Sequence, residues 1–348
     1  MITERELGGV RWVSARGASR AVFAELGELM RDEIRDILAD SETERLRRHV
    51  DAELGRLAAV TEAGSARFPG AWDELAAMAS GAGVPAEDLA LLNFRGDLGV
   101  FPSGGAGEAG GCSDLAWRRT RSFIAHNEDE PESYLGRCPL LTLRLDGQQP
   151  VAAFWVPGFL PANAFSVTGT GVVISVDHLP VPQPARVPGR GFVARELQRT
   201  ATSVEDAIEF LAENPSAGGF SYTIGDRTGR IVILESAAGQ CGWREVGSGD
   251  GPLGWHTNHG RYVEAAGTNP RGTSVRRGQI LAGLDEPGAE PDAEWFLAAL
   301  DQVRADPVGG KVATTLCSFV AELTSGQLVV RGRDCSPAGI GFGDLLTG

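Results

Sequence analysis

The chain has 348 residues, of which 42% are hydrophobic and 22% are charged, so it holds enough apolar material for a sizeable core and too much for a disordered chain. Its 46 acidic side chains outnumber its 32 basic ones, and the formal net charge of −14 repels phosphate backbones and anionic lipid headgroups. Composition therefore argues against nucleic acid and membrane surfaces as partners.

The first residues and the cysteines bear on location. The start, Met-Ile-Thr-Glu-Arg-Glu-Leu, places charges where a secretory signal has an apolar stretch. The longest charge-free stretch, residues 147–176, is interrupted by proline and glycine, which favours buried strands over a membrane helix. The five cysteines are odd in number and lack Cys-x-x-Cys spacing, which argues against a disulfide framework and a cysteine-rich zinc site. Together these features predict a cytoplasmic protein.

Helices are predicted throughout residues 18–93. An apolar stripe with a spacing of three to four residues comprises Ala21, Val22, Leu26, Met30, Ile34 and Leu38. Ser41 followed by Glu44 is a capping-box pattern that restarts a helix. Two short helices are expected at residues 72–79 and 86–92.

A glycine-rich stretch, residues 102–111, follows these helices and leads directly into Cys112. Because it has few side chains to pack, we expect an exposed flexible loop. Beyond Cys112 the pattern predicts short strands at residues 122–125, 140–145, 151–156, 172–176, 220–224, 231–234, 314–322 and 328–331. Turn signals at residues 225–229 and 324–326 predict hairpins, so much of the sheet should be antiparallel. Helices at residues 192–199, 204–213, 276–284 and 293–303 should cover its faces, which indicates a layered α+β fold.

The junction between Gly111 and Cys112 suggests self-cleavage. If the Cys112 sulfur attacks the Gly111 carbonyl, an N-to-S acyl shift and hydrolysis would free Cys112 as a new N-terminus. The new α-amino group has a reference pKa of about 7.7–8.0 and could accept the thiol proton. One residue would then supply nucleophile and base. The alternative is that Cys112 is an ordinary small residue at the start of a strand.

Three further segments support the chemical interpretation: His-Asn-Glu-Asp at residues 126–129, Trp-His-Thr-Asn-His at residues 255–259, and Val-Val-Arg-Gly-Arg at residues 329–333. With the Gly-Cys-Ser junction, the sequence resembles the isopenicillin N acyltransferase-like family of N-terminal nucleophile hydrolases over most of its length. Residues 125–129 and 157–165 look closer to the branch that contains β-alanyl-amine hydrolases. The resemblance implies a four-layer αββα sandwich. It also implies autocatalytic cleavage into a helical prosegment, residues 1–111, and a catalytic part, residues 112–348, which remain associated as one structural domain.

The resemblance also implies residue roles. Cys112 matches the nucleophile, Asp129 the carboxylate that holds its amino group, Asn258 an oxyanion-hole donor and Arg331 an arginine near the nucleophile. Without the resemblance, Asp129 reads equally as a turn residue and Arg331 as a solvated strand arginine. Candidate substrate-binding residues are His126, Asn163, His178 and His256, although a structural role for His178 is the commoner case.

The expected activity is hydrolysis of a linear amide, an N-acyl amine or amino-acyl amide, through an acyl-thioester and without a cofactor. Transfer of the acyl group to a second amine is the alternative, and a homodimer is left open. A metal hydrolase is a rival because possible ligands exist in His126, Asp129, His256 and His259, although His256 and His259 lack the helical spacing of a zincin. A non-catalytic binding scaffold is the other rival.

Overall fold

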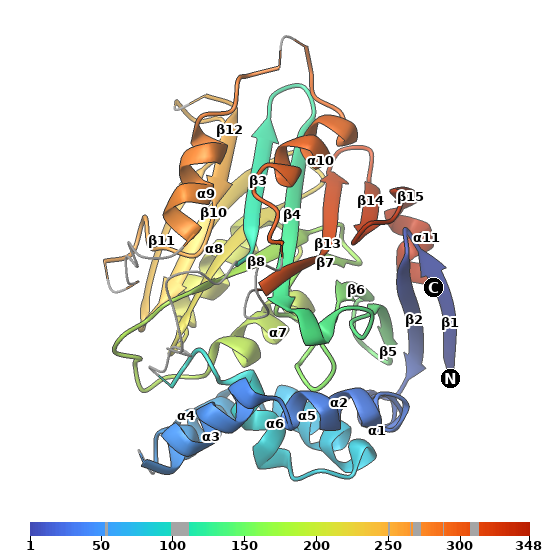
Figure 1. The fold of residues 1–348 in the computed structure, drawn as a ribbon, viewed down its shortest axis with the longest axis vertical. Helices are drawn as coiled ribbons and strands as arrows, with labels where there is room; N and C mark the ends of the chain where they lie inside the picture. Colours follow the sequence, from blue (N-terminus) through green and yellow to red (C-terminus); the bar gives the residue numbers. More distant parts are fainter. Residues whose placement is uncertain are drawn as a thin grey trace.

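The computed structural model describes residues 1–52, 55–98, 111–249, 251–264, 266, 273–287, 289–306 and 313–348. Of the predicted glycine-rich loop, residues 102–110 lie outside the described residues. The described strands form two sheets (Figure 1). The order in the larger sheet is β1 (Ile2–Leu7), β2 (Val10–Gly17), β5 (Leu140–Leu145), β6 (Val151–Phe154), β7 (Ser166–Thr168), β8 (Val173–Leu179), β9 (Gly219–Gly225), β10 (Ile231–Ala237) and β11 (Gln240–Glu245).

The smaller sheet carries the nucleophile candidate. Its order is β12 (Leu253–His256), β3 (Ser113–Arg118), β4 (Ser122–Pro131), β13 (Ala313–Glu322), β14 (Gln327–Gly332) and β15 (Ala338–Gly341). The predicted hairpins at residues 225–229 and 324–326 are confirmed, since β9 pairs antiparallel with β10 and β13 with β14.

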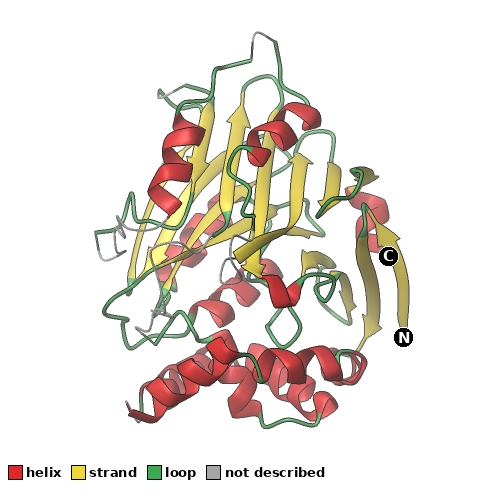
Figure 2. Ribbon diagram, in the orientation of Figure 1, coloured by secondary structure: helices red, strands yellow, loops and turns green. Residues whose placement is uncertain are grey.

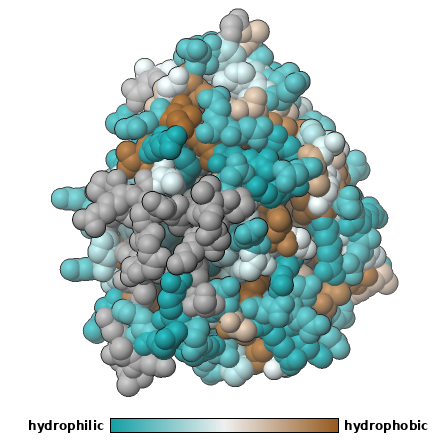
Figure 3. Space-filling model, in the orientation of Figure 1, coloured by the Kyte–Doolittle hydropathy of each residue, from teal (hydrophilic) through white to brown (hydrophobic). Residues whose placement is uncertain are grey.

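The two sheets pack face to face through aromatic side chains. The ring of Phe319 on β13 stacks on that of Phe165, which precedes β7, with centroids 4.7 Å apart. It also meets the edge of Phe154 on β6 at 5.5 Å. All three side chains are buried. Apolar side chains therefore fill this part of the space between the sheets. In Figure 3, the coloured part of the surface is mainly hydrophilic.

Helices cover both outer faces (Figure 2). The helices α7 (Arg190–Thr200) and α8 (Val204–Glu213) lie on the larger sheet, and α9 (Thr273–Ala282) and α10 (Ala293–Asp301) on the smaller. Phe296 of α10 packs on Phe123 of β4, with centroids 4.9 Å apart. The helix α11 (Phe342–Thr347) contacts β5. A short 3-10 helix, η1 (Glu132–Tyr134), follows β4. The predicted four-layer αββα sandwich is confirmed.

A helical layer from the N-terminal part closes one end of the molecule (Figure 1). It comprises α1 (Ser19–Leu29), α2 (Arg31–Leu38), α3 (Ser41–Ala52), α4 (Arg56–Arg67), α5 (Pro69–Ala82) and α6 (Ala86–Asn93). Five of the six residues of the predicted stripe are buried, whereas Ala21 is exposed. The stripe is divided at Met30, which lies between α1 and α2 with φ −105° and ψ 26°. Within the described ranges, no helix is both long and apolar enough to cross a membrane.

The first seventeen residues form strands that the sequence analysis did not predict. Gly8 and Gly9, both with positive φ, make the two-residue turn between β1 and β2. Strand β2 pairs parallel with β5, from Trp12 opposite Leu140 onward, whereas the other described strand pairs are antiparallel. Residues 1–111 and 112–348 thus share one sheet.

Candidate active site around Cys112

Strand alternation places Cys112 on the inner face of the smaller sheet. Cys112 directly precedes β3 and is 9% exposed. The ladder of β3 and β4 pairs Asp114 with His126. Since alternate residues of a strand share a face, the side chains of Cys112 and Asp114 point the same way as those of His126 and Glu128. This face looks toward the larger sheet, where Asp177 of β8 approaches Asp114 and His126.

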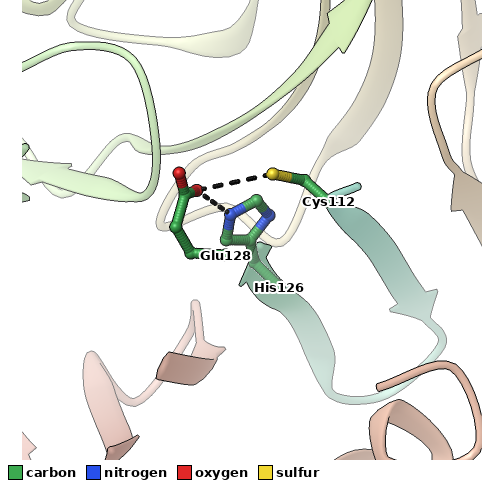
Figure 4. Close-up of side chains that lie close together, drawn as sticks. All are labelled: Cys112, His126 and Glu128. Atoms are coloured by element: carbon green, nitrogen blue, oxygen red, sulfur yellow. Dashed lines mark hydrogen bonds and ion pairs between the residues drawn. The ribbon is translucent and has the colours of Figure 1, made fainter. Parts of the chain in front are cut away.

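The Cys112 thiol is the first group in a row of four hydrogen-bonded, buried side chains. Figure 4 shows the first three, Cys112, Glu128 and His126. The Cys112 Sγ lies 3.7 Å from Glu128 Oε2 and 3.9 Å from the main-chain oxygen of Asp129. The same Glu128 oxygen lies 2.9 Å from His126 Nε2. On the far side of the ring, His126 Nδ1 lies 2.7 Å from Asp114 Oδ1.

Burial and charge determine which of these four side chains carry a proton. Burial raises the pKa of Cys112 well above its usual value, and the nearby carboxylates, Glu128 first among them, raise it further. Burial also raises the pKa of Glu128 to about 7, although His126 opposes this rise. Burial by itself would lower the pKa of His126, but its two carboxylate partners raise it well above the usual value. The ring is therefore a cation that donates from both nitrogens, and the resting thiol keeps its proton.

Asn258 and Arg277 surround the junction between Gly111 and Cys112. Arg277 of α9 donates from Nη1 to the Cys112 main-chain oxygen at 2.5 Å and to Ser113 Oγ at 2.7 Å. Its Nη2 donates to Asn258 Oδ1 at 2.7 Å, and Asn258 Nδ2 donates to the main-chain oxygen of His178 at 3.0 Å. A Cβ on Gly111 would lie 2.2 Å from Asn258 Oδ1, so this close approach requires glycine.

Asp129 lies at the same end of β4. Its Oδ1 accepts a hydrogen bond from Thr315 Oγ1 at 2.5 Å. Burial raises the pKa of Asp129 to about 7, while the charge of Arg277 lowers it. The charge of Asp129 in turn raises the pKa of Cys112. The structure thus brings together three of the four predicted catalytic residues: Cys112, Asp129 and Asn258.

The fourth, Arg331, lies elsewhere, which corrects the expectation that it approaches the nucleophile. Its Nη1 and Nη2 lie 3.0 and 2.6 Å from the two carboxylate oxygens of Asp301 at the end of α10. Along β14, the side chain of Val330 is buried, and alternation turns Arg331 toward the helical layer. Arg277 is instead the arginine that contacts Cys112, through the Cys112 main-chain oxygen. Sequence reasoning gave Arg277 no role, because no local motif marks it in the predicted helix.

Two of the candidate substrate-binding histidines are held by carboxylates. Both nitrogens of His126 have carboxylate partners, as described above. His256 is fully buried, with Nε2 2.8 Å from Glu235 Oε1 and Nδ1 3.5 Å from Asp177 Oδ2. Glu235 also accepts hydrogen bonds from the main-chain N–H groups of residues 261–263. In this arrangement His256 fixes the loop that carries Asn258.

The other two candidates differ from each other. The His178 ring contacts the guanidinium of Arg190; burial lowers its pKa well below the usual value, and the Arg190 charge lowers it further. His178 therefore reaches the site through its main-chain oxygen, which Asn258 contacts. Asn163 lies in the connection between β6 and β7, and its buried Oδ1 has no hydrogen-bond partner among the described residues.

Two groups of described residues have possible metal-ligand atoms within 4.8 Å of one another. The first is Cys112, His126 and Glu128, and the second is Asp114, His126 and Asp177. Both groups depend on His126, whose nitrogens are already hydrogen-bonded to carboxylates. The hydrogen bonds account for the grouping, and we do not treat these residues as metal ligands. The set suggested by the sequence, His126, Asp129, His256 and His259, forms no such group in the described part.

The family model described as acyl-coenzyme A:6-aminopenicillanic acid acyl-transferase matches residues 117–323, more than half of the chain. Asp129, Asn258 and Arg277 lie within the match, and Cys112 precedes it. A search of curated proteins finds no match.

The solved structures that are similar to this chain include the following two. A variant of conjugated bile acid hydrolase from Clostridium perfringens is 14% identical over 68% of this chain and 94% of its own, with a TM-score of 0.47. Penicillin V acylase from Agrobacterium tumefaciens is 13% identical over 67% of this chain and 88% of its own, with a TM-score of 0.43.

Proposed function

Given that the chain belongs to the acyl-coenzyme A:6-aminopenicillanic acid acyl-transferase family, we propose that it is a self-processing N-terminal nucleophile amidohydrolase with Cys112 as its nucleophile. One observation carries the proposal: the peptide bond between Gly111 and Cys112 adjoins a buried thiol, a side-chain amide and a guanidinium. Acyl transfer through a tetrahedral intermediate needs a nucleophile, and polar groups that can stabilise the developing oxyanion accelerate it.

In the cleavage step, the Cys112 sulfur attacks the Gly111 carbonyl carbon. A C–S bond forms, the peptide C–N bond breaks, and the nitrogen leaves as the α-amino group of Cys112 with the proton that the thiol gave up. Water then hydrolyses the thioester, which frees the thiol and leaves a carboxylate on Gly111. The oxyanion donor in this proposal is Asn258 Nδ2. In the uncut chain this group donates to the main-chain oxygen of His178, and Oδ1 faces Gly111, so the amide has to turn for the step.

In turnover, the new α-amino group accepts the thiol proton and passes it to the departing amine of a linear amide, an N-acyl amine or amino-acyl amide. Asp129 orients this amino group. Asn258 stabilises the oxyanion, and water resolves the acyl-thioester. A second amine in place of water would make the protein an acyltransferase, which the family description favours. The five cysteines, all in the described part, are unpaired, and this supports a reducing, cytoplasmic location.

Denaturing mass spectrometry tests the proposal. We expect the wild-type protein to give two chains, residues 1–111 and 112–348, and Cys112→Ala to remain one chain without amide turnover. Cys138→Ala is the matched control, because Cys138 is also a buried free thiol but has no part in the proposed chemistry, and this variant should be cleaved and active.

A panel of β-alanyl, γ-glutamyl and phenylacetyl amides, with and without a second amine, identifies the acyl group and the acceptor. Wild-type protein that turns over amides while its chain stays intact would overturn the proposal. So would a Cys112→Ala variant that is cut or active.

A further inference from the structure

Self-cleavage needs a proton acceptor that the mature enzyme does not need. Before the first cut, the nitrogen of Cys112 is part of a peptide bond with Gly111 and has no lone pair available as a base. Burial and the surrounding carboxylates also keep the thiol protonated. A thiol attacks as the thiolate, so the uncut chain must contain another group that takes the proton.

We propose that Glu128 is this base, and that His126 and Asp114 hold it in position. The inference rests on the proposed function and deepens it, because it assigns the first cut to a residue distinct from the α-amino group that serves turnover.

The contacts of the thiol carry the assignment. Among the described residues, Cys112 Sγ makes hydrogen-bond contacts with Glu128 Oε2 at 3.7 Å and with the main-chain oxygen of Asp129 at 3.9 Å. A main-chain carbonyl is not basic enough to keep the proton, whereas a carboxylate is. The side chain of Asp129 is engaged elsewhere, with Thr315. Glu128 is therefore the carboxylate in contact with the sulfur.

The neighbours of Glu128 fix its position. Glu128 is almost fully buried, at 1% exposure. The oxygen that faces the sulfur is the one that lies 2.9 Å from His126 Nε2. Asp114 holds the opposite nitrogen at 2.7 Å. Because the cross-strand pair of Asp114 and His126 sets the ring orientation, the carboxylate oxygen is aimed at the thiol before reaction begins.

Protons balance without any added reagent. The thiol proton moves to Glu128 Oε2 as sulfur bonds to the Gly111 carbonyl carbon. When the C–N bond breaks, Glu128 returns the proton to the departing nitrogen, and the carboxylate is restored. The pKa of Glu128, about 7, lies near neutral pH, which suits a group that both accepts and returns a proton.

The test follows the cleavage rate of freshly made protein. Wild type and variants are produced by cell-free synthesis and sampled over time by denaturing mass spectrometry. We expect Glu128→Gln to slow cleavage by about 10²-fold or more, as loss of a general base commonly does. Glu132→Gln is the control: Glu132 directly follows β4 in η1 and is exposed, so cleavage should proceed at the wild-type rate.

The pH profile separates a base from a structural residue. The wild-type cleavage rate should rise with pH through the pKa of Glu128, and Glu128→Asp, which keeps a carboxylate, should retain this rise. His126→Gln removes a cation that lowers the pKa of Glu128, so its profile should move to higher pH. The titratable groups that influence Glu128 or are influenced by it are Cys112, His126, Asp129, Glu130, Cys138 and Cys317.

The outcomes are distinguishable. A wild-type chain that is never cut overturns the proposed function and this inference together. A wild-type chain that is cut, beside Glu128→Gln cut within threefold of its rate, overturns only the role of Glu128. If circular dichroism shows that Glu128→Gln does not fold, the pH profile of cleavage by Glu128→Asp decides. A cleavage rate in Glu128→Asp that does not rise with pH counts against Glu128 as the base.

Discussion

Two buried histidines in this protein have the same kind of environment. His126 lies between Asp114 and Glu128, and His256 lies between Asp177 and Glu235. A cationic ring between carboxylates offsets the cost of burying their charges. The first histidine adjoins the thiol, and the second holds the loop that carries the side-chain amide beside Gly111.

The charge on His256 makes stability depend on pH. Burial opposes protonation, but Asp177 and Glu235 raise the pKa of His256 to about 9. The folded state therefore binds the proton more tightly than the unfolded chain, whose histidine has a pKa of about 6.5. This contribution to the free energy of unfolding is complete below about pH 6.5 and is lost as pH rises toward 9. We expect a loss of about 1–3 kcal/mol over this interval in wild type.

Urea unfolding at several pH values measures the effect. The change between pH 6.5 and 9 should be smaller in His256→Gln than in wild type, by about the amount just given. His259→Gln is the control, because burial and nearby cations lower the pKa of His259 to about 4, and its titration lies below this interval. An unchanged pH dependence in His256→Gln would show that His256 is neutral when folded.

Local residue patterns predicted part of this site and missed the rest. The Gly-Cys junction and the His-Thr-Asn-His segment are short motifs, and the structure places Gly111 against Asn258. Arg331 and Arg277 show what such motifs cannot decide. Each is an ordinary arginine in its own element, and the distinction between them depends on which face of a sheet one points to and where a distant helix packs. The sequence showed Glu128 only as part of the His-Asn-Glu-Asp motif. It did not indicate that Glu128 contacts the Cys112 thiol.

At the scale of elements, the helices α1 and α5 cross with their backbones unusually close. A Cβ on Gly27 would lie 2.0 Å from the main-chain oxygen of Met78, and one on Gly81 would lie 1.9 Å from that of Ala24. Neither glycine has a positive φ, so its role is to leave space. This close crossing allows the apolar side of α1, including Phe23 and Leu26, to pack in the core.

Gly81→Ala should therefore force the two helices apart. We expect the free energy of unfolding to fall by about 1–3 kcal/mol, the usual cost of overpacking, measured by urea unfolding. Gly343→Ala in α11 is the control, since a Cβ there meets nothing within 4 Å, and alanine is the better helix former by about 1 kcal/mol. The control should match or exceed wild-type stability. Equal stability of Gly81→Ala and wild type would mean that the crossing adjusts without cost.

Elements with strong periodicity or clear turn signals were predictable, and those that depend on distant partners were not. Helix α8 was predicted at its observed bounds, because capping and apolar spacing are local. Strand β1 has an exposed, charged pattern and reads as a solvated terminus. It becomes a strand by pairing with β2, which in turn pairs with β5, more than a hundred residues away. No local signal specifies that parallel pairing.

At the scale of the whole molecule, the larger sheet crosses the proposed cleavage point. Strands β1 and β2 precede the cut, and the other strands of that sheet follow it. We expect native mass spectrometry of processed protein to show one complex that contains both chains, although denaturing conditions separate them. The physical reason is the paired edge of β2 and β5 with its buried side chains, such as Val13.

A substitution in this pairing tests its contribution. Val13→Asp places an unpaired charge at a fully buried position, so the two chains should separate at a lower urea concentration than in wild type. The control is Thr3→Asp on the exposed side of β1. In this variant the two chains should separate at the same urea concentration as in wild type. Chains that part under native conditions in wild type would contradict the expectation.

The sheet that spans the proposed cut determines how the protein can be produced. A recombinant protein that starts at Cys112 would supply the nucleophile directly, but the edge of β5 would lack β2 and expose a row of unpaired backbone groups beside apolar side chains, a template for aggregation. In the proposed enzyme, residues 1–111 are a permanent subunit and not a disposable leader. Production of active material would require both segments, either as the uncut chain or by co-expression.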